Sequence, residues 1–315
     1  MVNVLFFGNS YISKIYLKEL HMNDYNILVI TSPDKKAYRG RKRVFSEVKI
    51  YANDNRIKLI QPEKFTIDIS HIIKNFNADF GIVVSYGKKI PKSIFKLPKY
   101  KIFNIHFSLL PKYRGAAPIQ HALCNGENIT GVTSFFIEEN IDTGNIIFQD
   151  YIHINKKDTA KTLINKLMPI GIRVMNKSIE YTMKKKKTIP QKGKPSYAPI
   201  IKKEQGLVNW KKRAIDIYNQ FRGLYIWPCI YSFITSGKLI GKRIKFIDVD
   251  VFEEVSINKK IGILVSIIKK EGFLITCSIG SILVRKIQIE NKAIMSSWSF
   301  IQGKQISIGD SFIKL

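Results

Sequence analysis

The N-terminal residues constrain the fold most, because they read as a buried strand that runs directly into a turn and a helix. Val2 to Phe7 is almost continuously apolar and rich in β-forming residues, as a strand buried on both faces is. The next three residues, Gly-Asn-Ser, suit a turn and a helix N-cap. Apolar residues then recur at helical spacing, at Ile12, Ile15, Tyr16 and Leu20.

The same alternation continues along the first half of the chain. Ile27 to Thr31 and Asp79 to Ser85 read as further buried strands, and Ile67 to Phe76 reads as a helix. We therefore expect an α/β domain with a Rossmann-like, doubly wound parallel sheet and a ligand beyond the carboxyl ends of its strands. The turn after the first strand lacks the Gly-x-Gly-x-x-Gly pattern, so nothing supports an NAD or FAD site.

The pattern changes after a basic segment that contains several prolines. Lys184 to Lys203 is rich in Lys and has no acidic residue, which is typical of an exposed linker. Short β-branched segments separated by turn residues follow, at 242–249, 261–268, 272–277 and 281–287, and they favour a small β-barrel or sandwich. We expect an N-terminal domain over residues 1–188, a basic linker over 189–205 and a C-terminal β-barrel domain over 206–315.

The charge balance is strongly basic. Lys and Arg number 52 against 24 Asp and Glu, which gives a net charge of +28. Such a surplus attracts phosphates and is typical of proteins that bind nucleic acid. The alternative is that an AT-rich genome supplies the many lysines, since few of the basic residues are Arg. The placement of the charge must therefore decide between these two explanations.

Several classes of protein are excluded by simple patterns. No apolar run reaches the length that spans a bilayer, and the N-terminus lacks the pattern of a signal peptide. The three cysteines, Cys124, Cys229 and Cys277, are too scattered for a disulfide framework or a zinc site. We expect a cytoplasmic protein with no metal and no membrane partner.

Residues that suit carbonyl chemistry are concentrated between positions 101 and 142. Lys101 to Phe107 reads as a strand, and Asn104 and His106 share one of its faces because side chains alternate. The Asn amide can donate to an oxyanion, and the His can exchange a proton near neutral pH. Asp142 lies in a turn-forming stretch between two β-rich runs and could favour the imidazolium of His106. A hydrogen-bonded interior pair and a hairpin corner are the ordinary structural alternatives.

Together these segments resemble the formyltransferase family that uses 10-formyltetrahydrofolate as its formyl donor. Residues 104–111 (Asn-Ile-His-Phe-Ser-Leu-Leu-Pro), 113–120 (Tyr-Arg-Gly-Ala-Ala-Pro-Ile-Gln) and 142–144 (Asp-Thr-Gly) match its motifs. Residues 85–91 resemble the strand end of its folate site, and the likeness covers almost the whole chain. The sequence departs from the family at Phe107, Asn140 and Asn145. Alternation predicts that Phe107 points away from the face that carries His106.

The resemblance implies roles for individual residues. Asn104 would orient and polarise the formyl oxygen, His106 would stabilise the tetrahedral oxyanion and take part in proton transfer, and Asp142 would hold His106. The folate would be bound by two groups of residues: Ser108, Leu109, Leu110 and Pro111, and Tyr86, Gly87, Lys88 and Ile90. The family needs no metal, and no Cys/His cluster in the sequence offers a site for one.

The family leaves open which amine accepts the formyl group. Its members formylate an aminoacyl-tRNA, a nucleotide-linked amino sugar or a glycinamide ribonucleotide, and the last group act as single domains. A basic loop that contains Arg39, Arg41 and Lys42 resembles the insertion that the tRNA-specific members place against the acceptor arm. A solvated charged loop is the ordinary alternative, but three of the ten Arg residues fall within five positions of this loop, and that clustering favours RNA binding. For the Lys-rich linker, RNA contact and compositional drift are equally supported.

The C-terminal region resembles the same tRNA-specific members. The matching segments are 207–210, 221–224 and 227–228, with Asn209 in place of the usual Asp. The likeness implies an open β-barrel of the oligonucleotide-binding type, and we expect Trp210 and Trp227 to be core residues. We therefore predict a monomer that formylates the α-amino group of initiator methionyl-tRNA for translation initiation. Formylation of a UDP-linked amino sugar, or RNA binding without catalysis, remain the alternatives.

Overall fold

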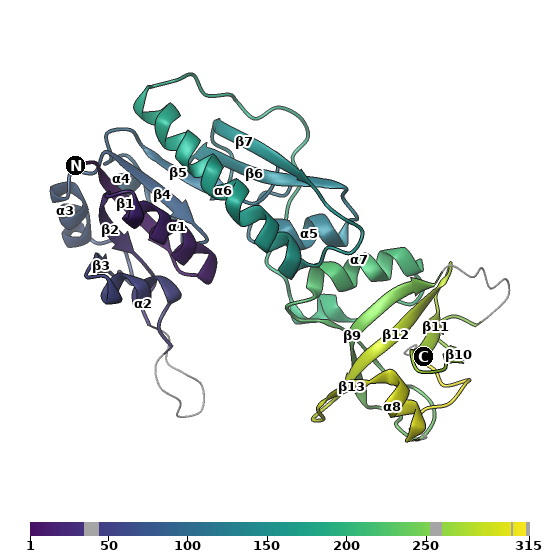
Figure 1. The fold of residues 1–315 in the computed structure, drawn as a ribbon. Helices are drawn as coiled ribbons and strands as arrows, with labels where there is room; N and C mark the ends of the chain where they lie inside the picture. The colour runs from purple at the N-terminus through teal and green to yellow at the C-terminus, as the bar shows by residue number, and fades with distance from the viewer. Residues whose placement is uncertain (35–43, 253–259, 304, 313–315) are drawn as a thin grey trace. The chain divides into compact units, whose positions relative to one another are not determined.

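The computed structural model describes residues 1–34, 44–252, 260–303 and 305–312, which form two compact units (Figure 1). Unit 1 comprises Met1–Pro118, Ile129–His153 and Asn165–Pro199. Unit 2 comprises Ile119–Asn128, Ile154–Ile164 and Ile200–Leu315. The predicted RNA-binding residues Arg39, Arg41 and Lys42 lie outside the described residues.

Unit 1 is built on a seven-stranded sheet with the order β3-β2-β1-β4-β5-β6-β7. The first five strands of this order are parallel, which confirms the expected α/β fold, and β6 and β7 are antiparallel. The antiparallel pair forms because a turn, rather than a crossover helix, joins these two strands. The strands are β1 (Asn3–Gly8), β2 (Asn26–Ile30), β3 (Lys58–Ile60), β4 (Phe80–Val84), β5 (Ile102–His106), β6 (Ile129–Phe136) and β7 (Ile146–His153).

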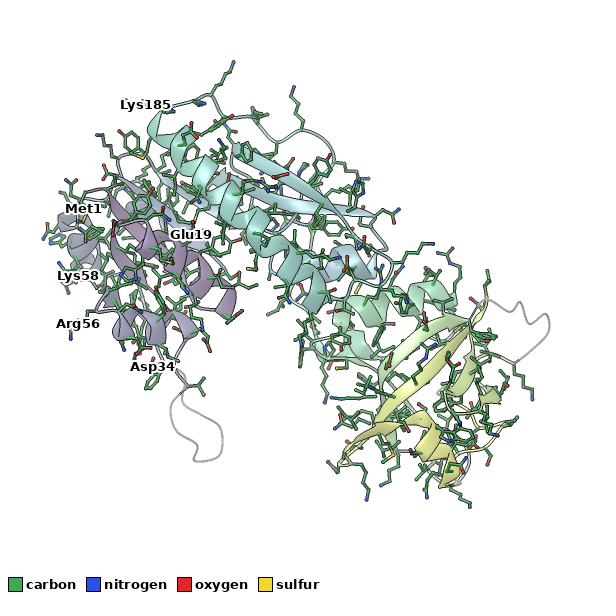
Figure 2. The ribbon with its side chains drawn as sticks, in the orientation of Figure 1. Met1, Glu19, Asp34, Arg56, Lys58 and Lys185 are labelled. Carbon is green, nitrogen blue, oxygen red and sulfur yellow. The ribbon has the colours of Figure 1, made fainter. Side chains whose placement is uncertain are left out.

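The first three helices begin at residues with capping side chains. Ser10 forms a capping box at the start of α1, as the Gly-Asn-Ser turn predicted, and Ser46 and Thr66 cap α2 and α3. Charged side chains such as Arg56, Lys58 and Lys185 project away from the ribbon (Figure 2). The helices up to residue 183 are α1 (Tyr11–Met22), α2 (Glu47–Asp54), α3 (Ile67–Asn75), α4 (Lys92–Phe95), α5 (Pro118–Cys124) and α6 (Ala160–Met183).

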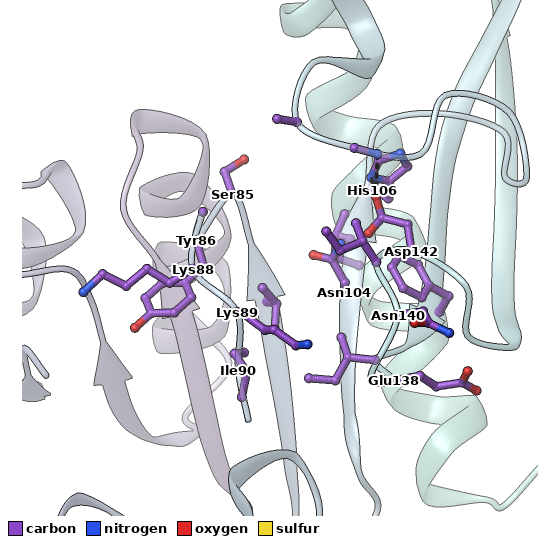
Figure 3. A pocket seen from close by; sticks show the side chains of 18 of the residues that line it. Ser85, Tyr86, Lys88, Lys89, Ile90, Asn104, His106, Glu138, Asn140 and Asp142 are labelled. Carbon is purple, nitrogen blue, oxygen red and sulfur yellow. Dashed lines mark hydrogen bonds and ion pairs between the residues drawn. The ribbon is translucent and has the colours of Figure 1, made fainter. Parts of the chain in front are cut away.

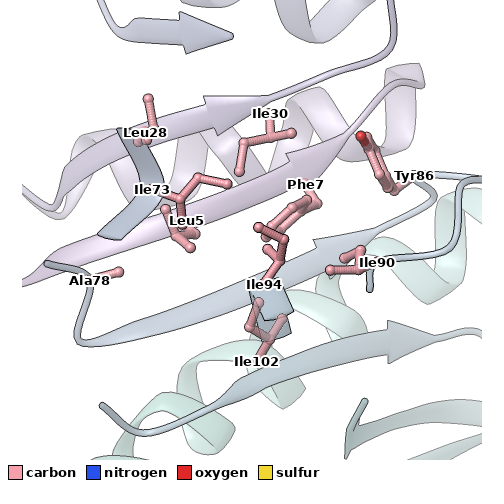
Figure 4. Packing of buried hydrophobic residues seen from close by; sticks show 10 residues of the cluster. All are labelled: Leu5, Phe7, Leu28, Ile30, Ile73, Ala78, Tyr86, Ile90, Ile94 and Ile102. Atoms are coloured by element: carbon pink, nitrogen blue, oxygen red, sulfur yellow. The ribbon is translucent and has the colours of Figure 1, made fainter. Parts of the chain in front are cut away.

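Helices cover both faces of the unit 1 sheet. On one face, Ile73 of α3 and Ile94 of α4 pack against buried residues of the parallel strands (Figure 4). The strand residues in this cluster include Leu5, Phe7, Leu28, Ile30 and Ile102. On the other face, the Tyr16 ring of α1 packs edge-on against Phe107, and a Cβ at Gly171 of α6 would overlap the Tyr16 hydroxyl. The two covered faces confirm the doubly wound arrangement.

Unit 2 contains a six-stranded antiparallel sheet. Its order is β10-β11-β12-β9-β8, with β13 paired to β12, so the path is open, as the family's open barrel implies. Trp210 is buried against Phe246 and Phe312, but Trp227 is 53% exposed, so its predicted place in the core is wrong. The elements are η2 (Lys203–Gly206), α7 (Ala214–Leu224), β8 (Ile230–Phe233), β9 (Arg243–Phe252), β10 (Leu264–Ile268), β11 (Gly272–Thr276), β12 (Ser281–Ile289), β13 (Ile294–Ser296) and α8 (Ser297–Gln302).

Residues 189–199, which we call the strap, differ from the exposed linker that the composition predicts. Ile189 exchanges two backbone hydrogen bonds with Ile146, at 2.8 and 2.9 Å, and Ala198 is fully buried. Lys192 and Lys194 are exposed. The amino-acid composition of the strap predicts exposed side chains. Its backbone, however, forms hydrogen bonds with other segments of unit 1.

Candidate active site

A pocket of about 510 Å³ lies at the carboxyl ends of β4 and β5 (Figure 3). This is the edge at which ligands bind in open parallel sheets, and the volume is that of a small-molecule site. The lining comes from residue 83 in β4 and residues 85–90 after it, residues 104–106 of β5 and residue 107 after it, residues 115, 116 and 118, and residues 135 and 137–142 at the end of β6 and beyond.

Asn104 and His106 lie on the same face of β5, as alternation predicts. Asn104 pairs with Phe135 of β6, and His106 pairs with Thr133, so the same face of the sheet continues onto the neighbouring strand. The ring of Phe107 packs on Tyr16, on the opposite, helix-covered face. The departure from the family pattern at Phe107 is therefore accommodated among the helices of unit 1.

The His106 ring is buried between two hydrogen-bonding groups. Its Nε2 atom donates to the backbone carbonyl of Tyr113 at 2.9 Å, and its Nδ1 atom lies 3.6 Å from the Oδ2 atom of Asp142. A carbonyl oxygen can only accept a hydrogen bond, so the proton of the neutral ring is on Nε2. The lone pair on Nδ1 therefore lies on the side of the ring that faces Asp142.

Burial lowers the pKa of His106, because the low dielectric around the ring disfavours the imidazolium. The Asp142 carboxylate and the Tyr113 carbonyl oppose this effect by favouring the charged form. The first effect is the larger, and the imidazole is therefore neutral near pH 7. A neutral His beside a carboxylate is suited to accept a proton and to hold it briefly.

Asp142 is held in place by the backbone around it. The residue adopts a left-handed conformation, with φ of 55°, in the turn between β6 and β7. Its Oδ2 atom accepts a hydrogen bond from the Gly115 N–H at 2.7 Å. The turn thus returns Asp142 to the sheet edge beside His106, as the sequence predicted.

The Asn104 amide is available to a ligand. Asn104 and Asp142 both line the pocket (Figure 3), and the Asn104 side chain makes no hydrogen bond to any residue within the described part of the chain. An amide N–H donor positioned in this way can stabilise negative charge on an oxygen atom that enters the pocket.

The predicted folate residues Tyr86, Gly87, Lys88 and Ile90 all line the pocket. Burial raises the pKa of Tyr86 to about 12, and its buried hydroxyl has no partner among the residues that the structure describes. The Lys88 ammonium donates to the Pro62 carbonyl at 3.2 Å and points away from His106 (Figure 3).

The other predicted folate residues, Ser108 to Pro111, do not line this pocket. The Thr133 hydroxyl donates to the Ser108 carbonyl at 2.6 Å and accepts from the Leu110 N–H at 3.2 Å. The Ser108 hydroxyl donates to the Lys112 carbonyl at 2.6 Å. These contacts hold the turn that places the Tyr113 carbonyl next to His106.

Some pocket residues were not assigned to the site from the sequence. Lys89 points toward the side of the pocket that carries Asn104, and Glu138, Asn140 and Ile141 come from the stretch before Asp142 (Figure 3). The position of this stretch between two β-rich runs was the signal that could have identified them. Within the described ranges, no group of three or more His, Cys, Asp or Glu residues could hold a metal ion, and no helix has the length and apolar character needed to cross a bilayer.

Comparisons with known proteins agree with this geometry. Residues 2–179 match the family described as formyl transferase, and residues 200–305 match formyl transferase, C-terminal domain. The chain is 58% identical over 312 residues to a methionyl-tRNA formyltransferase from Endomicrobium trichonymphae, over 99% of this chain and 100% of the relative. It is 41% identical over 316 residues to a methionyl-tRNA formyltransferase from Thermodesulfovibrio yellowstonii, over 98% of each chain.

A solved structure is also similar. An N-formyltransferase from Helicobacter canadensis, in complex with folinic acid and dTDP-3-aminofucose, matches with a TM-score of 0.66 at 25% identity. The match covers 90% of this chain and 99% of that one. The family matches span both halves of the chain, and the identity with the relatives extends over nearly its full length. The chain belongs to the formyl transferase family.

Proposed function

We propose that the chain transfers a formyl group from 10-formyltetrahydrofolate to the α-amino group of initiator methionyl-tRNA. The product is N-formylmethionyl-tRNA, which serves translation initiation. The observation that carries this proposal is the shared pocket of Asn104, His106 and Asp142, in a chain 58% identical along its length to a methionyl-tRNA formyltransferase. We propose further that the enzyme acts as a monomer in the cytoplasm.

The reaction needs one oxyanion stabiliser and one proton carrier. Attack of the amine on the formyl carbon forms a C–N bond, places negative charge on the formyl oxygen and leaves an extra proton on the nitrogen. Asn104 donates to that oxygen, and His106 accepts the proton at Nδ1, because Nε2 is already bonded to Tyr113. Asp142 stabilises the imidazolium that results. The proton then passes to the departing folate nitrogen as its bond to the formyl carbon breaks.

The properties of the pocket suit a folate donor. The backbone N–H groups of residues 87–90 make no backbone hydrogen bonds within the described part of the chain, so they are available to a polar heterocycle. Tyr86, Gly87, Lys88 and Ile90 supply this wall. Ser108, Leu109, Leu110 and Pro111 act from behind the pocket, through the turn that holds Tyr113 and His106.

We assign the RNA contacts to the loop with Arg39, Arg41 and Lys42 and to the antiparallel sheet of unit 2. The surplus of basic residues, with a net charge of +28, favours association with a phosphate backbone. Replacing the three loop residues together with Ala should raise the KM for tRNA and reduce its dependence on salt. Unchanged values of both would remove the loop from the tRNA interface.

A formyl-transfer assay tests the acceptor. The purified chain is mixed with 10-formyltetrahydrofolate carrying a labelled formyl group and with either charged initiator tRNA or a nucleotide-linked amino sugar, and His106→Ala is the control. Labelled methionyl-tRNA, absent with the control, supports the proposal. Labelled sugar alone would retain formyl transfer and overturn the tRNA assignment. No labelled product with either acceptor would overturn the proposed function.

A further inference from the structure

The Gln191 side chain connects the two segments that hold the candidate catalytic residues. Its Nε2 atom donates to the carbonyl oxygens of Asp142 and Gly144, both at 2.9 Å. Its Oε1 atom accepts from the Arg114 guanidinium, at 3.2 Å from Nε and 2.6 Å from Nη2. One neutral amide therefore joins the turn that carries Asp142 to the residue that follows Tyr113.

The rest of the strap strengthens this connection. The Ser196 hydroxyl accepts a hydrogen bond from the Tyr113 N–H at 2.9 Å, and the Arg114 carbonyl accepts one from the Ala198 N–H at 2.7 Å. Tyr113 in turn supplies the carbonyl that receives the Nε2–H of His106. Two residues of the strap therefore hydrogen-bond to the two residues that contact the His106 ring. Gln191 bonds to Asp142, and Ser196 bonds to Tyr113.

We propose that Gln191 is a positioning residue for formyl transfer, which sets the distance between Asp142 and His106 by holding the Asp142 turn against Arg114. This inference rests on the proposed function. The 3.6 Å contact between Nδ1 of His106 and Oδ2 of Asp142 is sensitive to small movements of the turn, and a displacement of about 1 Å in an active site can cost about a hundred-fold in rate. The chemistry of a planar amide fits the site, because it donates to two carbonyl groups and accepts from a cation at once.

Loss of Gln191 should alter the titration of His106. The carboxylate of Asp142 raises the pKa of His106 against the effect of burial, so a turn that moves away lowers that pKa further. Among the residues that the structure describes, the other charged groups that line the pocket or flank Gln191 are Lys88, Lys89, Glu138, Glu139, Arg114 and Lys192, and none of them is replaced in the variants below.

Two variants separate positioning from simple loss of folding. Gln191→Leu removes every hydrogen bond of the side chain. Gln191→Glu keeps the shape and the contact with Arg114, but turns a carboxylate oxygen toward two carbonyl oxygens. The matched control is Gln305→Leu, because among the described residues the exposed Gln305 side chain donates only to the nearby Gly303 carbonyl, at 3.2 Å. Thermal unfolding of each variant shows whether it remains folded.

The measurements are kcat and KM for both substrates, and the pKa of His106 from NMR of ¹³C-labelled histidine. For both Gln191 variants we expect kcat to fall by about ten- to a hundred-fold, with each KM within about two-fold of the original chain. The pKa of His106 should fall in Gln191→Leu, whereas Gln191→Glu is judged by kcat and KM because its added carboxylate would itself raise that pKa. Gln305→Leu should behave like the original chain.

Unchanged kcat and an unchanged His106 titration in a folded variant would overturn the inference. A rise in the KM for tRNA alone would also overturn it, because the strap would then be an RNA contact only. If the original chain formylates neither acceptor, the proposed function fails, but the His106 titration still decides the role of Gln191. If Gln191→Leu does not fold, kcat and KM are measured on Gln191→Glu, and an unchanged kcat there would overturn the inference.

Discussion

The Nε2 atom of His106 donates a hydrogen bond to the backbone carbonyl of Tyr113, 2.9 Å away. This contact selects one tautomer of the neutral ring and leaves Nδ1 as its basic atom. The carbonyl is aimed by the backbone, since Tyr113 has a left-handed φ of 60°. The tautomer of His106, the proposed base, is thus selected by a backbone carbonyl in a turn of the chain.

Replacement of His106 should remove the proton carrier and little else. We expect His106→Gln to lower kcat by about 10²- to 10⁴-fold, the usual range for general-base catalysis, with the KM for methionyl-tRNA nearly unchanged. Steady-state kinetics measure both values. His153→Ala is a suitable control, because His153 is exposed and does not line the pocket. A near-normal kcat for His106→Gln would exclude His106 from proton transfer.

Replacement of Asn104 should affect the transition state more than binding. Asn104→Ala removes the one side-chain amide donor that we assign to the formyl oxygen, and we expect kcat to fall by about 10²- to 10³-fold. The KM for 10-formyltetrahydrofolate should change little. A large rise in that KM with a normal kcat would instead make Asn104 a residue that binds the ground state.

Asp142→Asn should shift the pH dependence of kcat. The carboxylate raises the pKa of His106, so its loss lowers that pKa. The base must be neutral to act, and the acidic limb of the profile should therefore move to lower pH while the plateau of kcat falls. Initial rates between pH 5 and 8 would show this. A limb that stays in place would mean that another group controls it.

Burial of His106 should also make folding sensitive to acid. Its pKa in the folded chain is lowered relative to the unfolded value of about 6.5, so below that pH the unfolded chain binds a proton that the folded chain does not. The free energy of unfolding should therefore decrease as pH falls from about 6.5 toward the folded pKa. Urea denaturation at several pH values should show a shallower decrease for His106→Gln. Parallel curves for the two chains would contradict this.

Replacement of Gly115 should destabilise the folded chain. It has a φ of +124°, and an added Cβ would lie 2.6 Å from the Ala198 carbonyl oxygen. Gly115→Ala should lower the free energy of unfolding by at least about 1–3 kcal/mol, the usual cost of a strained backbone. It should also lower kcat, because the Gly115 N–H holds Asp142. Gly193→Ala is the matched control, with a φ of +97° and nothing near its Cβ. Equal effects of the two changes on stability would show that the contact with Ala198 contributes nothing.

Much of unit 1 could be predicted because its signals are local. The apolar run before Gly8 and the capping residue Ser10 lie next to each other in the sequence, and β1 and α1 follow from them. The shared face of Asn104 and His106 follows from the two-residue period of a strand. The place of Asp142 followed from turn chemistry between two β-rich runs.

The strap could not be predicted, because its contacts are made between residues far apart in the sequence. Gln191 stands among lysines, and composition alone describes an exposed linker. Its partners Asp142 and Arg114 lie 49 and 77 residues away. Trp227 shows a similar limit, since a large aromatic residue suggests a core position but only the tertiary packing decides its exposure.

The segments that form the site lie far apart in the sequence, and this affects how the enzyme regains activity after denaturation. The pocket needs the ends of β4, β5 and β6, and its supports come from the strap, which is the last segment of unit 1 to leave a ribosome. Contacts of high sequence separation form late because closing long loops is entropically costly. During refolding, helical circular dichroism should therefore return before formyl transfer. A nascent chain that ends before residue 189 should contain Asn104, His106 and Asp142 without the hydrogen bonds that the strap supplies.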